Sequence, residues 1–599
     1  MTLANMQHRD VGSRPTAVVL CLIIACGAWL RVHHYRGFDH SDEMEYLQAA
    51  SDLAAGDYRL PSPGDGGHAW LRWTIILPLA GAIVLFGPDD RACAVPFVLA
   101  SLAGLVLAYA LGRDLLRSRS AGLLAAALLA VVNQDVAWAT RLYPDALQSL
   151  FMALGVWLLL PSGGLAGGTG TADSGRLPPR QARRAILAGI SFALALNTNI
   201  ISAIFVPVPM MVLILAHSRR HAVRLASWMV VGFAAIYLPL TALYAAAADD
   251  PFLELTAIGY TDKPTGEAVD MGGFLASYWA RGWSRFGSEV RTPAHYEVFR
   301  LLMTDEGFLA VARPAGWCLL LWPLWSGLPS PHRRAWGLAA LWLLLLYAAY
   351  EFGGSFLPLR KVPRYLHMFL LPMILLIVAT WGPWLRGRAV VIGLCLAALF
   401  SLAHGLAGRV LLGGAAGPSG LDAVMAGDAA VLAYLLIFGL LLAGRRPAAP
   451  ALAVGLLVFT VFLWCQKLGT GLNAHTQLGR VVQAAVGDGP VYTNCWRTGM
   501  YLRSLHLHHL GRDGVVTACR VEDLWRGVED GRMVVMYARP VSQYGYCALS
   551  QEDSEKLLPV LHEKCALLFD NGLYRVFAPR IGTNSGETND RPASDAERG

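Results

Sequence analysis

Long apolar runs alternate with short polar turns along most of this chain. The hydrocarbon core of a bilayer needs about 20 apolar residues in a helix, and thirteen runs approach that length. The pattern predicts an α-helical polytopic membrane protein with about 13 spans. The expected spans lie near residues 16–32, 92–112, 120–137, 145–161, 185–198, 199–216, 225–247, 308–328, 336–353, 365–383, 389–409, 429–443 and 449–467.

Composition agrees with this class of protein. Of the 599 residues, 55% are hydrophobic and only 15% are charged, which disfavours a soluble enzyme. The formal net charge of +7 is modest, so its distribution among the loops is more informative than its sum. We expect membrane lipid, and no nucleic acid, among the partners of this chain.

Basic residues predict the orientation of the spans. Turns such as "GRDLLRSRS" (112–120) and "GRLPPRQARR" (175–184) are rich in Arg, as cytoplasmic turns are. All of them fall inside only if residues 70–87 lie along the outer interface as a juxtamembrane helix. This predicts a multi-pass protein of the cell inner (cytoplasmic) membrane with residues 1–15 in the cytoplasm. A removable signal peptide is the alternative for the first run.

The first outer loop, residues 33–91, carries an acidic stretch. "GFDHSDEMEYLQAASDLAAGDY" (37–58) is predicted to form an amphipathic helix that begins near Asp42 and stops at Gly56. Asp42 and Glu43 stand at the helix start, where backbone N–H groups favour negative charge. Catalytic carboxylates and simple helix-cap acids are both compatible with this pattern.

A second outer turn adds another acid. "NQDVAWATRLYPDALQSLF" (133–151) places Arg141, Tyr143 and Asp145 at the predicted membrane surface, around a proline that can begin the next helix. A lone Asp in such a place is either part of a site or an ordinary acid at a helix N-terminus.

Basic residues on two further outer loops complete the candidate set. Arg360, Lys361 and Arg364 form a dense cluster on the short outer loop 354–364, against the positive-inside rule. Phosphate recognition accounts for such a cluster, and contact with lipid headgroups is the alternative. The large outer loop 248–307 interleaves aromatic residues with Arg281 and Arg285, which is consistent with either a gating loop or an interfacial helix.

The composition changes after the last span. Short β-type segments at 490–495, 515–520, 532–538 and 565–578 alternate with helical connections and predict a small extracytoplasmic α/β domain over 469–579. An oxidising compartment would allow two disulfides with three alternative pairings. The polar residues 580–599 are predicted to be a disordered tail. The cysteines of this domain are Cys495, Cys519, Cys547 and Cys565.

Outer carboxylates beside a basic cluster suit transfer of a sugar from a polyprenyl phosphate. A carboxylate can remove the proton of an acceptor hydroxyl, and cations can stabilise the departing phosphate. A lipid or glycan transporter or flippase is the alternative from another class. That class would place charges near the bilayer centre and repeat its halves, whereas these spans hold almost no acids.

At these motifs the sequence resembles the GT-C glycosyltransferases that use polyprenyl-phosphate sugars. This branch includes protein O-mannosyltransferases, lipid A aminoarabinose transferases and rhizobial lipopolysaccharide galacturonosyltransferases, and is similar to glycosyltransferase family 39. The resemblance covers most of residues 16–470. It rests on "SDEMEYLQAASDLAAGDY", "LFGPDDRACAV", "TRLYPDALQSLF" and "RKVPRYLHMFLLPMILL".

The resemblance implies roles for several candidate residues, and we expect a transfer that inverts the anomeric carbon. Asp42 would be the catalytic carboxylate, Glu43 its neighbour and Asp145 the second acid of the site. No cofactor is implied with certainty; a divalent cation, Mg²⁺ or Mn²⁺, would lie at Asp42 and Asp145 if one is used. The expected acceptor is a glycolipid, glycan or protein hydroxyl. The residues expected at the donor phosphate are Arg141, Arg360, Lys361 and Arg364, and those of the substrate loops are Tyr143, Arg281 and Arg285.

The chain departs from the family pattern at two places. Relatives carry a Pro-rich approach to the juxtamembrane helix where this chain has "PSPGDGGHAWLRW" (61–73). In "ALNTNIISAIF" (195–205), Asn and Thr stand where many relatives carry a Lys near the outer surface.

Overall fold

A computed structural model describes most of the helical part of the chain and much of its C-terminal part. The chain divides into two compact units, Met1–Leu472 and Asn473–Gly599, close to the domain boundary predicted at 468/469. The described residues are 13–38, 42–61, 68–161, 178–251, 253–254, 298, 302, 309–320, 330–353, 363–382, 389–397, 399, 448–465, 474–486, 490–495, 498, 501–506, 515–517, 521–530, 532–537, 551–571 and 574–580.

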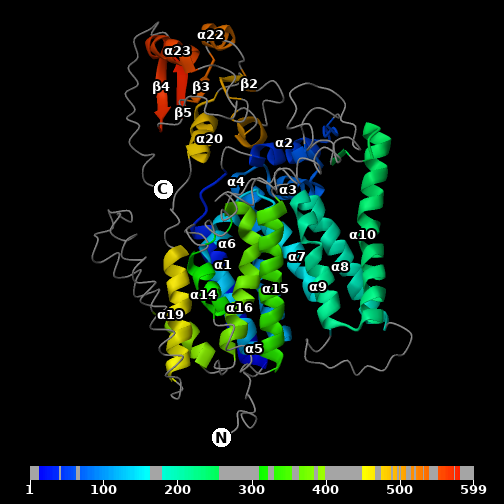
Figure 1. The fold of residues 1–599 in the computed structure, drawn as a ribbon. Coiled ribbons are helices and arrows are strands. Elements are labelled where there is room, and N and C mark those ends of the chain that lie inside the picture. Colours follow the sequence, from blue (N-terminus) through cyan, green and yellow to red (C-terminus); the bar gives the residue numbers. More distant parts are fainter. Residues whose placement is uncertain are drawn as a thin grey trace. The chain divides into compact units, whose positions relative to one another are not determined.

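The first unit is a bundle of helices with shorter helices at one end (Figure 1). One continuous apolar core runs through it, built mainly from Leu, Ala, Val and Ile. Its elements are α1 (Ser13–His33), α2 (Asp42–Ala55), η2 (His68–Leu71), α3 (Trp73–Phe86), α4 (Asp90–Leu116), α5 (Arg119–Val131), α6 (Asn133–Trp138), α7 (Asp145–Leu159), α8 (Pro179–Thr198), η3 (Ile200–Phe205), α9 (Pro207–Ala216), α10 (Arg219–Ala248), α14 (Leu309–Leu320), α15 (Ser330–Gly353), η6 (Pro363–Phe369), α16 (Leu370–Trp381) and α19 (Ala448–Cys465).

Several of these helices have the length and composition of membrane spans. Among the described residues, three are long and apolar enough to cross a bilayer, namely Arg14–His33, Asp90–Leu116 and Arg219–Ala248. Shorter apolar helices include Arg119–Val131 and Asp145–Leu159. The full thirteen-span layout stays a prediction, because the expected span 429–443 and parts of others lie outside the described residues.

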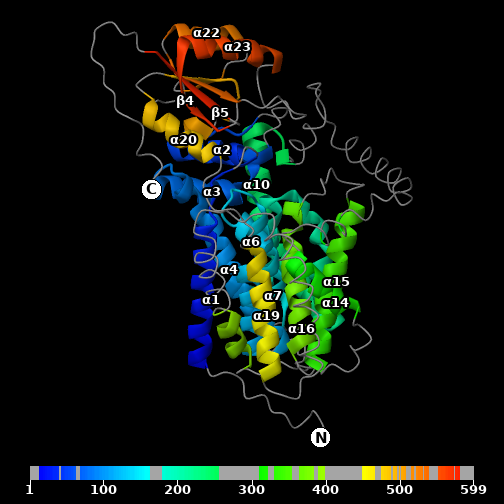
Figure 2. The same ribbon diagram turned by 90° about the vertical axis from the view of Figure 1, so that its left-hand side faces the viewer.

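The helix expected along the outer interface is short. α3 has 14 residues, or about 21 Å at 1.5 Å per residue, which is less than the thickness of a hydrocarbon core. Figures 1 and 2 show α2 and α3 at one end of the bundle rather than among its long helices. This arrangement supports the prediction that residues 70–87 do not span the membrane.

Two predicted spans are interrupted. The expected helix 120–137 was wrong as a single element, because α5 ends at Val131 and α6 restarts after Val132, whose backbone is extended. The interruption turns the polar residues Asn133, Gln134 and Asp135 into the protein interior, where all three are buried. The expected helix 199–216 is likewise divided into η3 and α9.

Two glycines allow α8 and α10 to pack backbone to backbone. A Cβ atom added at Gly189 would lie 1.9 Å from the carbonyl oxygen of Met229, and one at Gly232 would lie 2.0 Å from that of Ile186. No real Cβ atom approaches a backbone oxygen so closely. Small residues at such crossings are how membrane helices come close enough for van der Waals packing to hold them together.

The second unit is a five-stranded sheet with helices. Its strands are β1 (Val491–Thr493), β2 (Val515–Thr517), β3 (Val534–Tyr537), β4 (Cys565–Asp570) and β5 (Tyr574–Pro579), and its helices include α20 (Ala474–Ala485), α22 (Val521–Glu529) and α23 (Gln551–Lys564). The order is β2-β1-β3-β5-β4. β1 pairs in parallel with β2 and β3, while β5 pairs antiparallel with β3 and β4.

The predicted segment 565–578 forms two strands rather than one. β4 and β5 pair antiparallel, and Asn571 at the turn accepts a hydrogen bond at its side-chain Oδ1 from the backbone N–H of Tyr574 at 2.8 Å. Cys565 is a free thiol, so two disulfides do not form among the four cysteines of this domain. Cys519, Cys547 and residues 581–599 of the tail predicted at 580–599 lie outside the described residues.

We expect Gly232→Ala to lower the thermal stability of the detergent-purified protein. The added methyl group must push α8 away from α10, and overpacking of this kind costs about 1–3 kcal/mol. Gly81→Ala is the matched control, because a Cβ at Gly81 meets nothing within 4 Å. Equal melting temperatures for the two variants would contradict the close packing of these helices.

Candidate active site

The acidic helix of the first outer loop forms as the sequence predicts. α2 begins at Asp42, and its first turn holds Asp42, Glu43 and Glu45. Met44 is fully buried beneath this turn. The helix ends before Gly56, whose φ of +79° is a conformation that favours glycine.

One hydrogen bond joins this helix to the second predicted segment. The Glu43 carboxylate is fully buried, and its Oε1 accepts a hydrogen bond from the backbone N–H of Leu142 at 2.9 Å. Asp42 beside it is only half-buried. The structure therefore brings the acidic helix against the turn that contains Arg141, Tyr143 and Asp145.

That turn is organised around Trp138. The guanidinium of Arg141 lies 5.0 Å from the centre of the Trp138 ring, a cation–π distance, and the Tyr143 ring meets the same indole edge-on at 5.1 Å. Pro144 precedes α7, and Asp145 is the first residue of that helix. The Asp145 side chain is buried where the helix N-terminus favours a negative charge.

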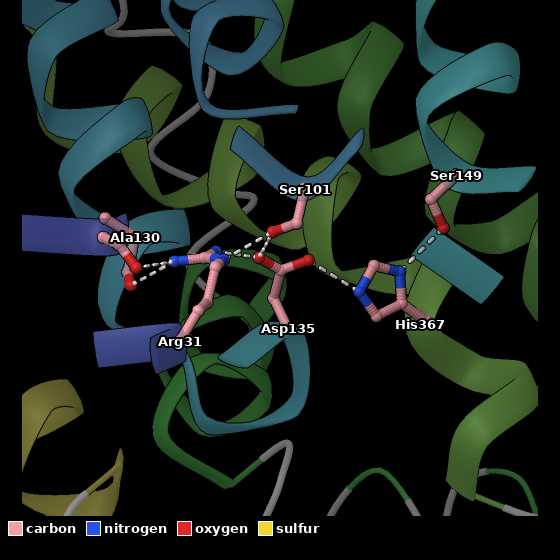
Figure 3. A network of polar contacts seen from close by, with 7 residues as sticks. Arg31, Ser101, Ala130, Asp135, Ser149 and His367 are labelled. Atoms are coloured by element: carbon pink, nitrogen blue, oxygen red, sulfur yellow. Dashed lines mark hydrogen bonds and ion pairs between the residues drawn. The ribbon is translucent and has the colours of Figure 1, made fainter. Parts of the chain in front are cut away.

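The third predicted segment meets the same helices through His367 of η6. The His367 Nδ1 atom lies 2.8 Å from the Ser149 hydroxyl of α7, and its Nε2 atom lies 2.8 Å from Oδ1 of Asp135 in α6. η6 therefore packs beside α6 and α7, and Figure 3 shows the imidazole of His367 between Asp135 and Ser149. The side chain of Arg364, and all of Arg360, Lys361, Arg281 and Arg285, lie outside the described residues.

Sequence reasoning missed the buried ion pair behind this contact (Figure 3). Arg31, near the end of α1, is fully buried and forms a salt bridge with Asp135. Its Nε donates to the Ser101 hydroxyl at 2.7 Å, and its Nη1 donates to the carbonyls of Gly27 at 2.7 Å and Ala130 at 3.3 Å. A basic residue at the end of one apolar run and an acid inside another were the only signals in the sequence.

A small cavity adjoins this network. It has a volume of about 40 Å³, and its polar lining comes from Ser101, Asp135, Ser149 and His367, with apolar residues around them. A buried water needs roughly 10–15 Å³ of such space and two to four polar partners. The cavity therefore has room and hydrogen-bonding groups for a few water molecules.

A second polar cluster joins α3, α8 and the start of the large outer loop. The side-chain amide of Asn197 donates to Oε1 of Glu254 at 2.6 Å and to the carbonyl of Leu71 at 3.2 Å. Its Oδ1 accepts from the backbone N–H of Thr74 at 3.1 Å. Asn197 therefore links α8 to the start of α3 and to Glu254.

Glu254 has an unusual protonation equilibrium. Burial raises the pKa of its carboxyl from 4.5 to about 7, although the hydrogen bond from Asn197 and the nearby Arg72 guanidinium oppose the shift. Arg72 itself donates to the Tyr46 hydroxyl of α2. A perturbed carboxyl beside polar and aromatic groups is a feature common at functional sites.

The described residues offer no ready metal site. They contain no group of three or more His, Cys, Asp or Glu side chains that could hold a metal ion. Asp42 and Asp145 therefore do not belong to such a group among them, and the sequence-based suggestion of Mg²⁺ or Mn²⁺ at these two residues stays a prediction.

We expect Glu254 to make stability depend on pH. Because its pKa in the folded state lies above its ordinary value, its stabilising contribution is full below about pH 4.5 and is lost as pH rises through about 7. Melting curves of detergent-purified Glu254→Gln should lack this loss. Asp249→Asn, at an exposed neighbouring acid, is the control and should keep the parent pH profile. An unchanged profile for Glu254→Gln would contradict the assignment.

Comparison with known proteins adds a match to one family model over part of the chain, and a shared fold. The model of the family described as dolichyl-phosphate-mannose-protein mannosyltransferase matches residues 74–164, which contain α3, α4 and the second outer turn. No curated protein sequence matches the chain.

Two solved structures of ArnT from Cupriavidus metallidurans share the fold. The structure bound to undecaprenyl phosphate has a TM-score of 0.55 at 17% identity and covers 96% of this chain and 100% of that one. The apo structure has a TM-score of 0.54 at 16% identity and covers 95% of this chain and 98% of that one. The matched segment and the shared fold together support the resemblance to the GT-C glycosyltransferases seen in the sequence.

Proposed function

We propose that this glycosyltransferase moves a sugar from a polyprenyl-phosphate donor to an acceptor hydroxyl at the outer face of the cytoplasmic membrane. The observation that carries the proposal is the Glu43–Leu142 hydrogen bond, which joins the acidic helix to the turn before Asp145. An ArnT structure of the same fold holds undecaprenyl phosphate, which supports a lipid phosphate as the donor's leaving group. The acceptor is an envelope glycolipid, a polysaccharide or a protein.

The two acids at the start of α2 have different roles in this proposal. The Glu43 carboxylate is buried and bonded to a backbone amide, so it fixes the helix in place. Asp42 is half-buried and stands one residue earlier, at the edge of the protein interior. Asp42 is therefore the better general base, since a base must reach the substrate hydroxyl.

The proposed reaction is a single displacement with inversion at the anomeric carbon. Asp42 takes the proton of the acceptor hydroxyl as its oxygen bonds to that carbon, and the bond from the carbon to the phosphate oxygen breaks. The polyprenyl phosphate leaves with the electron pair, and Arg360, Lys361 and Arg364 stabilise its charge. Asp145 orients Asp42 or the acceptor. No step is assigned to a metal ion.

The remaining candidates surround the substrate in this proposal. Arg141 adds positive charge near the phosphate, although its guanidinium also stacks on Trp138. Tyr143 is buried against the same indole and helps to fix the conformation of the turn. Arg281 and Arg285 are assigned to the substrate loop from the sequence alone, because they lie outside the described residues.

We expect Asp42→Asn to lower turnover by about 100- to 10,000-fold, the usual cost of losing a general base. The substitution keeps the shape of the side chain, so folding and lipid-phosphate binding should remain. Sugar transfer is measured with purified protein, donor and acceptor. Asp52→Asn is the control, because an Asn there still offers the Gln48 side chain an oxygen acceptor. Transfer by Asp42→Asn at near the parent rate would remove Asp42 from the catalytic role.

The orientation is tested separately with topology reporters. A reporter fused at residue 118, in the Arg-rich turn between α4 and α5, should be found in the cytoplasm. A reporter at residue 480 should be found outside. The reverse result at either position would contradict the topology in which α3 lies along the membrane surface.

A further inference from the structure

A polar network of unusual length crosses the interior of the first unit. It runs from Arg31 in α1 through Asp135 in α6 to His367 in η6 and ends at Ser149 in α7 (Figure 3). Arg31, Asp135 and His367 are each less than 5% exposed. Charges are rarely buried in an apolar bundle without a function that offsets the desolvation cost.

Hydrogen-bonding rules determine how His367 is held. An ionised carboxylate only accepts hydrogen bonds, so Nε2 of His367 carries the proton that it donates to Asp135. The Ser149 hydroxyl can donate to Nδ1 of a neutral ring or accept from a protonated one. Both contacts therefore survive in either protonation state, and the ring stays fixed.

The helix that carries His367 needs this support. η6 is a 3-10 helix of seven residues, and such helices have poorer hydrogen-bond geometry than α-helices and are seldom long. It contains Arg364 three residues, or one turn, before His367. The position of the Arg364 backbone is therefore tied to the position of the imidazole.

We propose that His367 is a positioning residue for donor binding. Its hydrogen bonds to Ser149 and Asp135 hold η6, and with it Arg364, where the donor phosphate binds. Arg31 and Ser101 hold the same carboxylate at its other oxygen: both bind Oδ2 of Asp135, whereas His367 binds Oδ1. This inference rests on the proposed use of a polyprenyl-phosphate donor, which Arg364 would contact.

The test measures binding of undecaprenyl phosphate to the full-length protein in detergent, together with KM and kcat for the donor. His367→Leu loses both hydrogen bonds and should weaken binding on the order of tenfold, a free-energy change of about 1.4 kcal/mol. The KM for the donor should rise in proportion, and kcat at saturating donor should stay within about twofold of the parent. His367→Gln can restore part of the hydrogen bonding to Asp135 and Ser149, so its affinity for undecaprenyl phosphate should lie between those of the parent and His367→Leu.

Two further variants keep the result interpretable. Thr460→Val removes another buried hydroxyl of the bundle, one that donates to Leu456 of its own helix at 2.7 Å, and should bind like the parent. Ser149→Ala removes only the Nδ1 contact and should weaken binding about threefold in the same direction, by about half the free energy of the larger change. It serves as the test if His367→Leu does not fold.

The outcomes separate the two proposals. If the parent does not bind undecaprenyl phosphate, the proposed donor class is wrong. If the parent binds and both the His367 and Ser149 variants bind equally well, the positioning role alone is wrong. A fall in kcat and melting temperature with unchanged donor affinity would assign the network to general stability and would also overturn the inference.

Discussion

The buried carboxylate of Asp135 is the constraint on which the arrangement of this bundle depends. A charge inside an apolar interior must be paired, and breaking such a pair by removing one partner costs about 3–5 kcal/mol. The partners of Asp135 come from α1, α4 and η6, so satisfying one acid fixes three elements around the short helix α6. The break between α5 and α6 at Val132 belongs to the same constraint, since it turns Asp135 toward Arg31.

A second buried interaction, the hydrogen bond between Glu43 and Leu142, joins the first outer loop to the bundle. The Glu43 carboxylate holds the start of α2 against the backbone of Leu142, and Asp145 begins α7 three residues later. Both interactions involve the segment 133–145, because Asp135 stands near one end of it and Leu142 near the other. The acidic helix and η6 are thus positioned by neighbouring parts of one turn.

Local sequence patterns predicted many of the helices and their ends. The apolar runs, the start of α2 at Asp42, its stop at Gly56 and the start of α7 after Pro144 all follow from spacing and capping chemistry. The contacts between buried charged side chains do not follow from such patterns, because Arg31 and Asp135 are 104 residues apart and Asp135 and His367 are 232 apart. The periodicity of a single sequence does not predict which buried charged residues will form a contact. The division of the span 120–137 was also missed, because no Pro or Gly marks the break at Val132.

The polar cluster around Asn197 carries little positive charge. Asn197 binds Glu254 and the first turn of α3 without adding positive charge. Burial raises the pKa of Glu254 to about 7, so this cluster is neutral or negative near neutral pH apart from Arg72. Arg72 in turn is engaged by Tyr46 of α2. In the proposed reaction the positive charge for the phosphate then comes from Arg141 and from Arg360, Lys361 and Arg364, and His367 is proposed to position the backbone of Arg364.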